Sequence, residues 1–171
     1  VNKVLIVDRC ASDQAVKIGR LDAMGELYWM ALPSHPRSAA AVVAFDSVAR
    51  RVCDWSNEQD HLIDCFTRVR GGARGAPRTD MAIECGAAML RTRRFVVEPW
   101  RAVREAIVVA GTGGDEVCSR AVSAAGRAAR DGIYVVAKCF DRDGGGMAAL
   151  DQVKPNCVCI DEINAAVANL G

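Results

Sequence analysis

The chain of 171 residues lacks the features that mark several broad classes of protein. Its formal net charge is only +1, so no strong field favours binding to nucleic acid or to a membrane surface. It has no signal-peptide pattern and no apolar run long enough to span a bilayer. Aromatic residues make up only 5% of the chain. We therefore expect a cytoplasmic protein that binds neither nucleic acid nor a membrane.

The sequence also lacks the cysteine spacing that would predict a metal site. Eight cysteines are present, but no two form a CxxC pair. Most stand inside apolar segments, so we expect buried thiols in a reducing compartment. Only Cys157 and Cys159 are close in sequence, and in a strand they would share one face. With just two histidines, His35 and His61, a His/Cys metal site is an alternative that no spacing supports.

What the sequence does contain is typical of an α/β protein. Apolar residues make up 51% of the chain, with many alanines. Short β-branched runs alternate with helical patterns, which predicts a doubly wound parallel sheet of the flavodoxin-like class. The pattern starts twice, so we expect two units, residues 1–105 and 106–171. The second unit has only three expected strands, so it should need another element, another chain or self-association to cover its sheet.

The expected elements follow from apolar periodicity, caps and breaks. For the first unit, the sequence predicts strands at 3–7, 26–32, 52–54 and 95–97 and helices at 13–24, 39–49, 60–70, 80–90 and 101–105. For the second unit, it predicts strands at 107–110, 133–139 and 157–160 and helices at 115–130 and 147–153.

Two acidic residues end apolar strands in the first unit. Asp8 follows the run from Val4 to Val7, and Asp54 follows Val52 and Cys53, 46 positions after Asp8. That separation is the length of one β-α-β-α-β passage. Because the carboxyl ends of parallel strands meet at one edge of a sheet, we expect the two carboxylates to be neighbours there.

The segments KVLIVDRCASD, RVCDWSN, AIECGAAML and RRFVVEPW together resemble a response-regulator receiver domain of two-component signalling. The resemblance implies that Asp54 is a phosphoacceptor and that Asp8 and Asp54 hold Mg²⁺, which would neutralise charge during phosphoryl transfer. It also implies Thr79 as a weak switch candidate and a histidine kinase or phosphotransfer protein as the partner. A receiver of this kind is a signalling or binding module rather than an enzyme.

Two positions depart from the receiver pattern. Arg9 stands where the family has a second acid, and Glu98 stands where it has a lysine. Both departures oppose phosphorylation, so a pseudo-receiver that only binds partners is the second form of this hypothesis. Residues 131–164 resemble part of a receiver again, with Asp161 in the phosphoacceptor position.

A glycine-rich loop predicts a different class of function. Gly111, Thr112, Gly113 and Gly114 follow an expected strand and precede an expected helix, where backbone N–H groups can bind phosphate. Asp141 ends the next strand, where a dinucleotide site places its ribose-binding acid. The alternative hypothesis is therefore a nucleotide-binding α/β enzyme.

Overall fold

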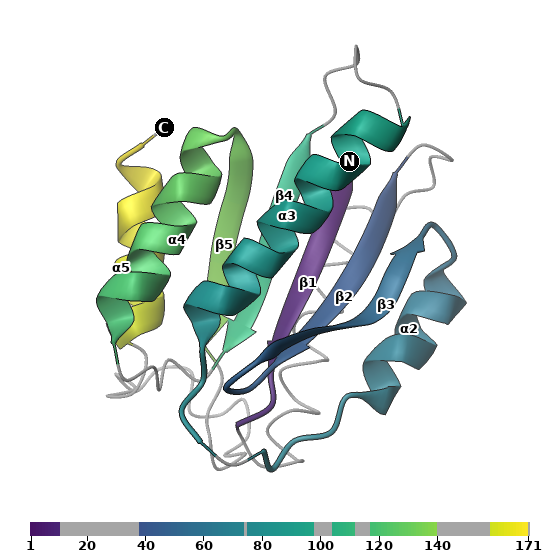
Figure 1. The fold of residues 1–171 in the computed structure, drawn as a ribbon, viewed down its shortest axis with the longest axis horizontal. Coiled ribbons are helices and arrows are strands. Elements are labelled where there is room, and N and C mark those ends of the chain that lie inside the picture. Colours follow the sequence, from purple (N-terminus) through teal and green to yellow (C-terminus); the bar gives the residue numbers. More distant parts are fainter. Residues whose placement is uncertain (11–37, 74, 98–103, 112–116, 140–157, 171) are drawn as a thin grey trace, which may run out of the picture.

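A computed structural model describes residues 1–10, 38–73, 75–97, 104–111, 117–139 and 158–170. They form one five-stranded sheet of order β3-β2-β1-β4-β5, flanked by helices (Figure 1). Its strands are β1 (Asn2–Asp8), β2 (Ala39–Phe45), β3 (Ala49–Ser56), β4 (Glu105–Gly111) and β5 (Ile133–Cys139). The helices are α2 (Gln59–Arg68), α3 (Thr79–Val97), α4 (Cys118–Arg130) and α5 (Val158–Ala168). The predicted α/β class is confirmed.

The sheet is mixed, with one antiparallel strand at its edge. β1 is central and pairs in parallel with β2 and β4, and β4 pairs in parallel with β5. β3 runs antiparallel to β2 because only residues 46–48 join the two strands. A parallel connection needs a crossover of a dozen or more residues, so this short turn can only make a hairpin. Asp46 closes the turn by accepting a hydrogen bond from the Val48 N–H at 3.0 Å.

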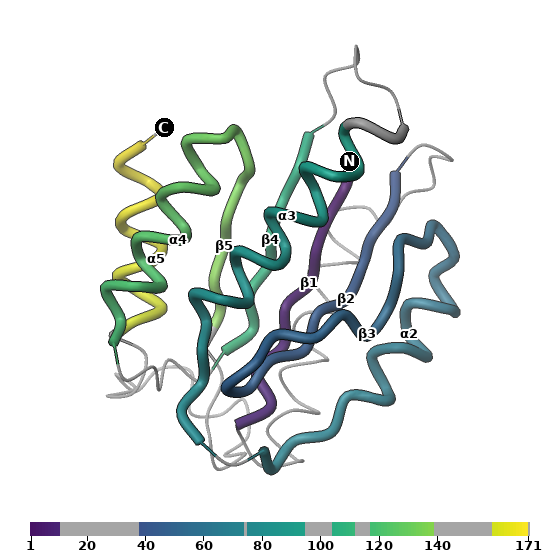
Figure 2. The backbone as a smooth tube through the Cα atoms, viewed as in Figure 1, coloured from purple at the N-terminus to yellow at the C-terminus, as the bar shows by residue number. Residues whose placement is uncertain are grey.

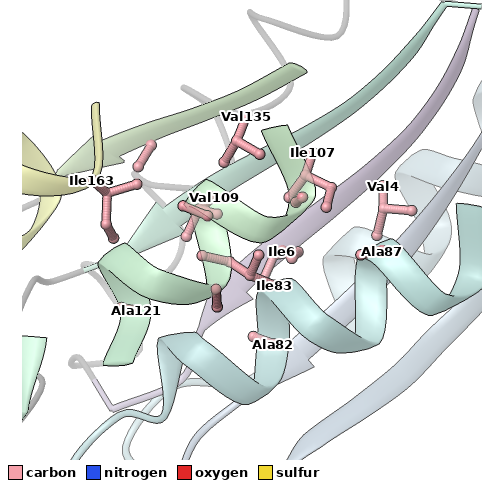
Figure 3. Close-up of a cluster of buried hydrophobic side chains, with 14 of the residues drawn as sticks. Val4, Ile6, Ala82, Ile83, Ala87, Ile107, Val109, Ala121, Val135 and Ile163 are labelled. Atoms are coloured by element: carbon pink, nitrogen blue, oxygen red, sulfur yellow. The ribbon is translucent and has the colours of Figure 1, made fainter. Parts of the chain in front are cut away.

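Apolar side chains of the central strand are buried on both faces of the sheet. Val4 and Ile6 lie in the cluster covered by α3, α4 and α5, whereas Leu5 and Val7 lie in the cluster covered by α2. This alternation follows from the period of two along a strand. Figure 3 shows the first cluster, in which Ile83 of α3 meets Ile6. A strand covered on both faces is continuously apolar, as the sequence predicted.

Helix α3 approaches the sheet closely at Gly86. A Cβ atom there would lie 3.3 Å from Ile6 Cδ1 and 3.3 Å from Val4 Cγ1. By contrast, a Cβ atom at Gly126 in α4 would meet only Leu170 Cδ1, at 3.8 Å. The missing side chain at Gly86 therefore lets the helix pack against the centre of the sheet.

The exposed edge of β5 is partly closed by a side chain from α5. Asn164 accepts a hydrogen bond from the Ala137 N–H at 2.9 Å and donates one to the Ala137 carbonyl at 2.8 Å. The amide thus pairs with the strand as a neighbouring backbone would. An edge covered in this way is less available for pairing with another chain.

Several predicted elements are confirmed, with small changes of boundary. The strands predicted at 3–7, 52–54, 107–110 and 133–139 are β1, β3, β4 and β5, and the helices predicted at 60–70, 80–90 and 115–130 are α2, α3 and α4. The elements predicted at 13–24, 26–32 and 147–153 lie outside the described residues. Among the residues that are described, no helix is long and apolar enough to cross a membrane.

Four predicted elements are wrong in whole or in part. The helix expected at 101–105 is contradicted at Glu105, which is the first residue of β4, while 101–103 lie outside the described residues. The alanine-rich segment 39–49 was expected to be a helix, but Ala39–Phe45 is strand β2. Residues 95–97 were expected to be a strand, but they form the last turn of α3. The strand expected at 157–160 is instead the start of α5 at Val158. In these last three cases the short apolar run could form either a helix or a strand, and packing in the folded protein decides between the two.

Strands from both expected units lie in the same sheet, since β4 of the second unit pairs with β1 of the first. The division into units 1–105 and 106–171 stays a prediction about independent folding. We expect residues 106–171, expressed alone, to be disordered or self-associated, because β4 would lose β1 and expose an apolar edge. Amide NMR and sedimentation of the fragment measure this. A monomeric fragment with well-dispersed amide signals would contradict the expectation.

A second prediction concerns the contact of α3 with the sheet. Gly86→Val should lower the free energy of unfolding by about 1–3 kcal/mol, because its side chain would clash with Val4 and Ile6. The matched variant Gly126→Val should change stability by less than about 0.5 kcal/mol, since that position has room. Chemical denaturation of both variants gives the two values. Equal losses would mean that Gly86 has no special packing role.

Candidate functional site

The candidate site lies at the carboxyl edge of the sheet, where β1 ends in Asp8. The Asp8 side chain is fully buried, and its Oδ1 accepts a hydrogen bond from the Cys10 N–H at 2.7 Å. Cys10 is also buried. A carboxylate at the end of a buried strand is placed where α/β proteins carry their ligand sites, because the loops begin there.

The segment before α3 is bound to the same edge by backbone hydrogen bonds. The Ala73 N–H donates to the Arg9 carbonyl at 3.0 Å, and the Arg78 N–H donates to the Asp46 carbonyl at 2.8 Å. These bonds bring the first residue of α3, Thr79, to the same end of the sheet as Asp8 (Figure 2). Thr79 is buried, with 1% of its surface exposed.

Two ion pairs lie near this edge of the sheet. Arg9 lies 3.4 Å from the Asp46 carboxylate and donates from Nε to the Arg70 carbonyl at 2.8 Å. Arg78 binds Asp80 through both ends of its guanidinium, at 2.9 and 2.8 Å. That hydrogen bonding by Arg78 holds the pKa of the Asp80 carboxyl below its usual value. The two arginines therefore neutralise Asp46 and Asp80.

The structure does not bring Asp54 to this edge. In the antiparallel strand β3, Asp54 lies between Cys53, which pairs with Val42, and Ser56, which pairs with Ala40. That position is level with the middle of β1 and two strands away from Asp8. The expectation that Asp8 and Asp54 are neighbours is wrong, because it assumed a parallel third strand.

The surroundings of Asp54 are those of a surface residue. Its side chain is 69% exposed. Oδ1 accepts a hydrogen bond from the Trp55 N–H at 3.0 Å and lies 3.4 Å from an Arg51 nitrogen. An exposed ion pair of this kind contributes little to stability.

Of the residues named in the nucleotide-binding hypothesis, only Gly111 is among those that the structure describes. Gly111 is the last residue of β4 and is buried. Thr112, Gly113, Gly114 and Asp141 lie outside the described residues. Glu98, which the receiver resemblance placed at the end of a strand, also lies outside them.

Among the described residues, two disulfides overturn the expectation that the cysteines are reduced thiols. Cys53 of β3 is bonded to Cys65 of α2, with Cα atoms 5.7 Å apart, and Cys118 of α4 is bonded to Cys159 of α5, with Cα atoms 5.3 Å apart. The sequence could not show these pairings, because they depend on which helix face meets which neighbour. Of the other described cysteines, Cys85 of α3 is a half-buried free thiol.

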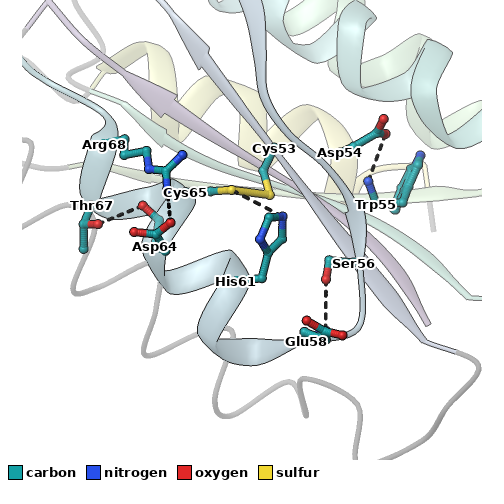
Figure 4. Close-up of a disulfide and its surroundings, with 10 residues drawn as sticks. All are labelled: Cys53, Asp54, Trp55, Ser56, Glu58, His61, Asp64, Cys65, Thr67 and Arg68. Atoms are coloured by element: carbon teal, nitrogen blue, oxygen red, sulfur yellow. Dashed lines mark hydrogen bonds and ion pairs between the residues drawn. A yellow bond between two sulfur atoms is a disulfide. The ribbon is translucent and has the colours of Figure 1, made fainter.

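Next to the first disulfide lies His61, which was expected near the start of a helix but not beside a cysteine pair. His61 is one helical turn before Cys65, and its Nε2 lies 3.8 Å from the Cys65 Sγ (Figure 4). The spacing of four residues, which puts both side chains on one face of a helix, was the signal available in the sequence.

Comparisons with known proteins define the fold. No family model and no curated protein matches the sequence. The chain is similar in structure to BatB, a conserved hypothetical protein from Bacteroides thetaiotaomicron, with 17% identity over 98% of this chain and 87% of that one and a TM-score of 0.69. It is also similar to the VWA domain of SpRpn10, with 12% identity over 95% and 82% of the two chains and a TM-score of 0.62.

A third similar structure is the manganese-loaded TRAP protein of Plasmodium vivax, with 15% identity over 100% of this chain and 72% of that one and a TM-score of 0.67. These neighbours are von Willebrand factor A (VWA) domain proteins. At such low identity the likeness concerns the fold, which is a mixed α/β sheet of the VWA type.

These findings correct the receiver hypothesis. The structural neighbours are not response regulators, so phosphoryl transfer to Asp54 and a histidine kinase partner are wrong. The physical cause of the error is that the resemblance rested on an apolar first strand ending in an acid, Asp8, and on a third strand assumed to be parallel, whereas β3 is antiparallel. The nucleotide-binding enzyme alternative is also unsupported.

The disulfides generate a prediction. Peptide mapping under non-reducing conditions should recover Cys53 linked to Cys65 and Cys118 linked to Cys159. Reduction should lower the free energy of unfolding by roughly 3 kcal/mol for a loop as short as the first, because cross-links restrict the unfolded chain. Denaturation with and without reductant measures this loss. Recovery of both peptide pairs only as separate alkylated thiols would contradict the assignment.

Proposed function

We propose that this chain is a VWA-type protein-interaction module that binds an acidic partner through a divalent cation at the carboxyl edge of its sheet. The single observation that carries the proposal is the buried carboxylate of Asp8 at the end of β1, on the edge where α3 begins at Thr79. The comparison with VWA proteins supports an interaction or adhesion role.

The side chains at this edge fit a hard divalent cation. Asp8 offers carboxylate oxygens and Thr79 offers a hydroxyl, and Mg²⁺ prefers such oxygen ligands. Magnesium is commonly held by one or two carboxylates and keeps several waters. One carboxylate, that of Asp8, is therefore enough to hold such a cation, because water and a partner's side chain would occupy its other coordination positions. The manganese-loaded TRAP protein shows that a neighbour of this fold holds such a metal.

The same edge of the sheet would attract an anionic group of a partner in addition to the cation. The amino-terminal end of α3 carries a partial positive charge. A cation on Asp8 would add to this field, while Arg78 neutralises the nearby Asp80. An acidic side chain of a partner could then complete the coordination of the cation and face the helix end. Asp8 holds the cation, and the cation and helix end together select a carboxylate.

The disulfides bear on the compartment in which the protein works. A cytoplasmic protein was expected, but the two disulfides oppose that location, because glutathione keeps thiols reduced there. An oxidising compartment suits both the disulfides and an adhesion role.

Metal binding is tested by substitution of Asp8. Asp8→Asn should weaken Mn²⁺ binding at least tenfold, because it removes the charge while an amide oxygen can still accept the Cys10 N–H. The matched control is Asp54→Asn, which removes an exposed acid far from the edge and should leave Mn²⁺ affinity unchanged. Mn²⁺ electron paramagnetic resonance titrations measure both. Equal affinities of Asp8→Asn and the unchanged chain would rule out this site.

The ligand class is tested separately. Adding a glutamate-containing peptide to the Mn²⁺-loaded chain should lower water-proton relaxation, because the peptide carboxylate displaces a metal-bound water. The matched peptide with glutamine in place of glutamate should have no effect. An equal response to both peptides would contradict selection of a carboxylate while leaving the metal site intact.

A further inference from the structure

A second group of metal-ligating side chains lies on the opposite side of the sheet from α3, between β3 and α2. Cys53 of β3 and Cys65 of α2 are buried, with 2% and 5% of their surfaces exposed. His61 is exposed and stands one turn before Cys65. Figure 4 shows its imidazole directed at the sulfur pair. Within the described part of the chain, no other group of three such residues has this proximity.

The distances suit a tetrahedral metal ion. The two Sγ atoms and the His61 ring nitrogen lie within 4.8 Å of one another, and Nε2 is 3.8 Å from the Cys65 Sγ. Zinc binds thiolate at about 2.3 Å and imidazole at about 2.0–2.1 Å, so its ligand atoms are separated by roughly 3.5–3.8 Å. The imidazole is therefore already near its required place. Only the two sulfur atoms must move apart, which breaking their bond allows.

We propose that Cys53, His61 and Cys65 form a zinc-type site when the disulfide is reduced. A thiol or phosphine reductant supplies two electrons, the S–S bond breaks and each sulfur takes a proton. Two reductant thiols give up these protons and become a disulfide, whereas a phosphine becomes a phosphine oxide with the oxygen of a water molecule that supplies both protons. Binding of Zn²⁺ then releases those two protons, because thiolate is the ligand. Water would take the fourth position, because His61 is exposed to solvent.

The consequence is that β3 and α2 stay joined in either redox state. When oxidised, the disulfide connects them, and when reduced, the metal does. The second disulfide has no such replacement, because among the described residues no third ligand lies within 4.8 Å of both Cys118 and Cys159, although Glu162 Oε2 is 3.2 Å from Cys118 Sγ. It therefore serves as an internal control. This proposal does not depend on a metal at Asp8.

Cobalt reports on the site directly. The full chain is reduced with a phosphine, the reductant is removed without air, and Co²⁺ is added. We expect one equivalent to bind with thiolate-to-cobalt charge-transfer absorption and the visible bands of tetrahedral cobalt, and Zn²⁺ to displace it. The oxidised chain should give neither signal. Zn²⁺ should also raise the melting temperature of the reduced chain.

Variants identify the ligands. His61→Ala should weaken Co²⁺ binding at least tenfold, and because His61 is exposed this chain should fold as before, which circular dichroism checks. Cys53→Ser combined with Cys65→Ser should abolish the charge-transfer band. Cys118→Ser combined with Cys159→Ser should retain it, as should Cys10→Ser, which tests for a thiolate beside Asp8.

Three results would overturn the proposal. The first is a reduced chain that shows no thiolate-to-cobalt band. The second is a His61→Ala chain that binds Co²⁺ as tightly as the unchanged chain. The third is a band that disappears with Cys118 and Cys159 or with Cys10. If the Cys53 and Cys65 double variant fails to fold, the Co²⁺ affinity of the His61→Ala chain still tests the site.

Discussion

Burial of β1 on both faces is the constraint on which the rest of the structure depends. Residues 4–7 of this strand are at most 1% exposed, so helices must cover both sides of the sheet. A strand enclosed in this way can carry a polar side chain only at its ends. Asp8 stands at one end and is held by the Cys10 N–H. The candidate metal edge is thus a direct result of how the core is built.

The opposite end of the sheet is closed by charged side chains from α3. Glu105 at the start of β4 is only 3% exposed in its side chain and is paired with Arg94. Arg93 donates to the Asn2 side chain at 3.0 Å and lies 4.7 Å from the centre of the Trp55 ring. Burial lowers the pKa of Arg93. These contacts fix the carboxyl-terminal part of α3 while Gly86 fixes its middle, so the first turn at Thr79 is held at the other edge.

Sequence reasoning succeeded where local pattern and packing agree. The runs that became β1 and β4 are β-branched and buried on both faces, which is typical of strands in a parallel sheet, and in β5 the buried residues alternate with more exposed ones. It failed at Ala39–Phe45, whose alanines favour a helix in isolation. There the small side chains instead allow a strand to lie between β1 and β3 under α2.

The same reasoning explains why the site was only half found. Asp8 could be named because it ends an apolar run, whereas Thr79 was named only through the receiver resemblance, which the structure overturns. Their placement at one edge depends on backbone hydrogen bonds from Ala73 and Arg78, which no local pattern encodes. Asp54 was misplaced because the direction of β3 follows from the length of a turn, and that turn was read as part of a helix.

The two described disulfides lie beside the edge strands of the sheet, where fewer side chains are buried than on the central strands. β3 is an edge strand whose side chains are mostly exposed or half-buried, and it is held to α2 by Cys53–Cys65. α5 lies beside the other edge strand and is held to α4 by Cys118–Cys159. Apolar burial stabilises the central strands, but it weakens toward both edges of the sheet. Covalent links at those two places stabilise the elements that burial alone holds least, and His61 would give one of them a second way to do so.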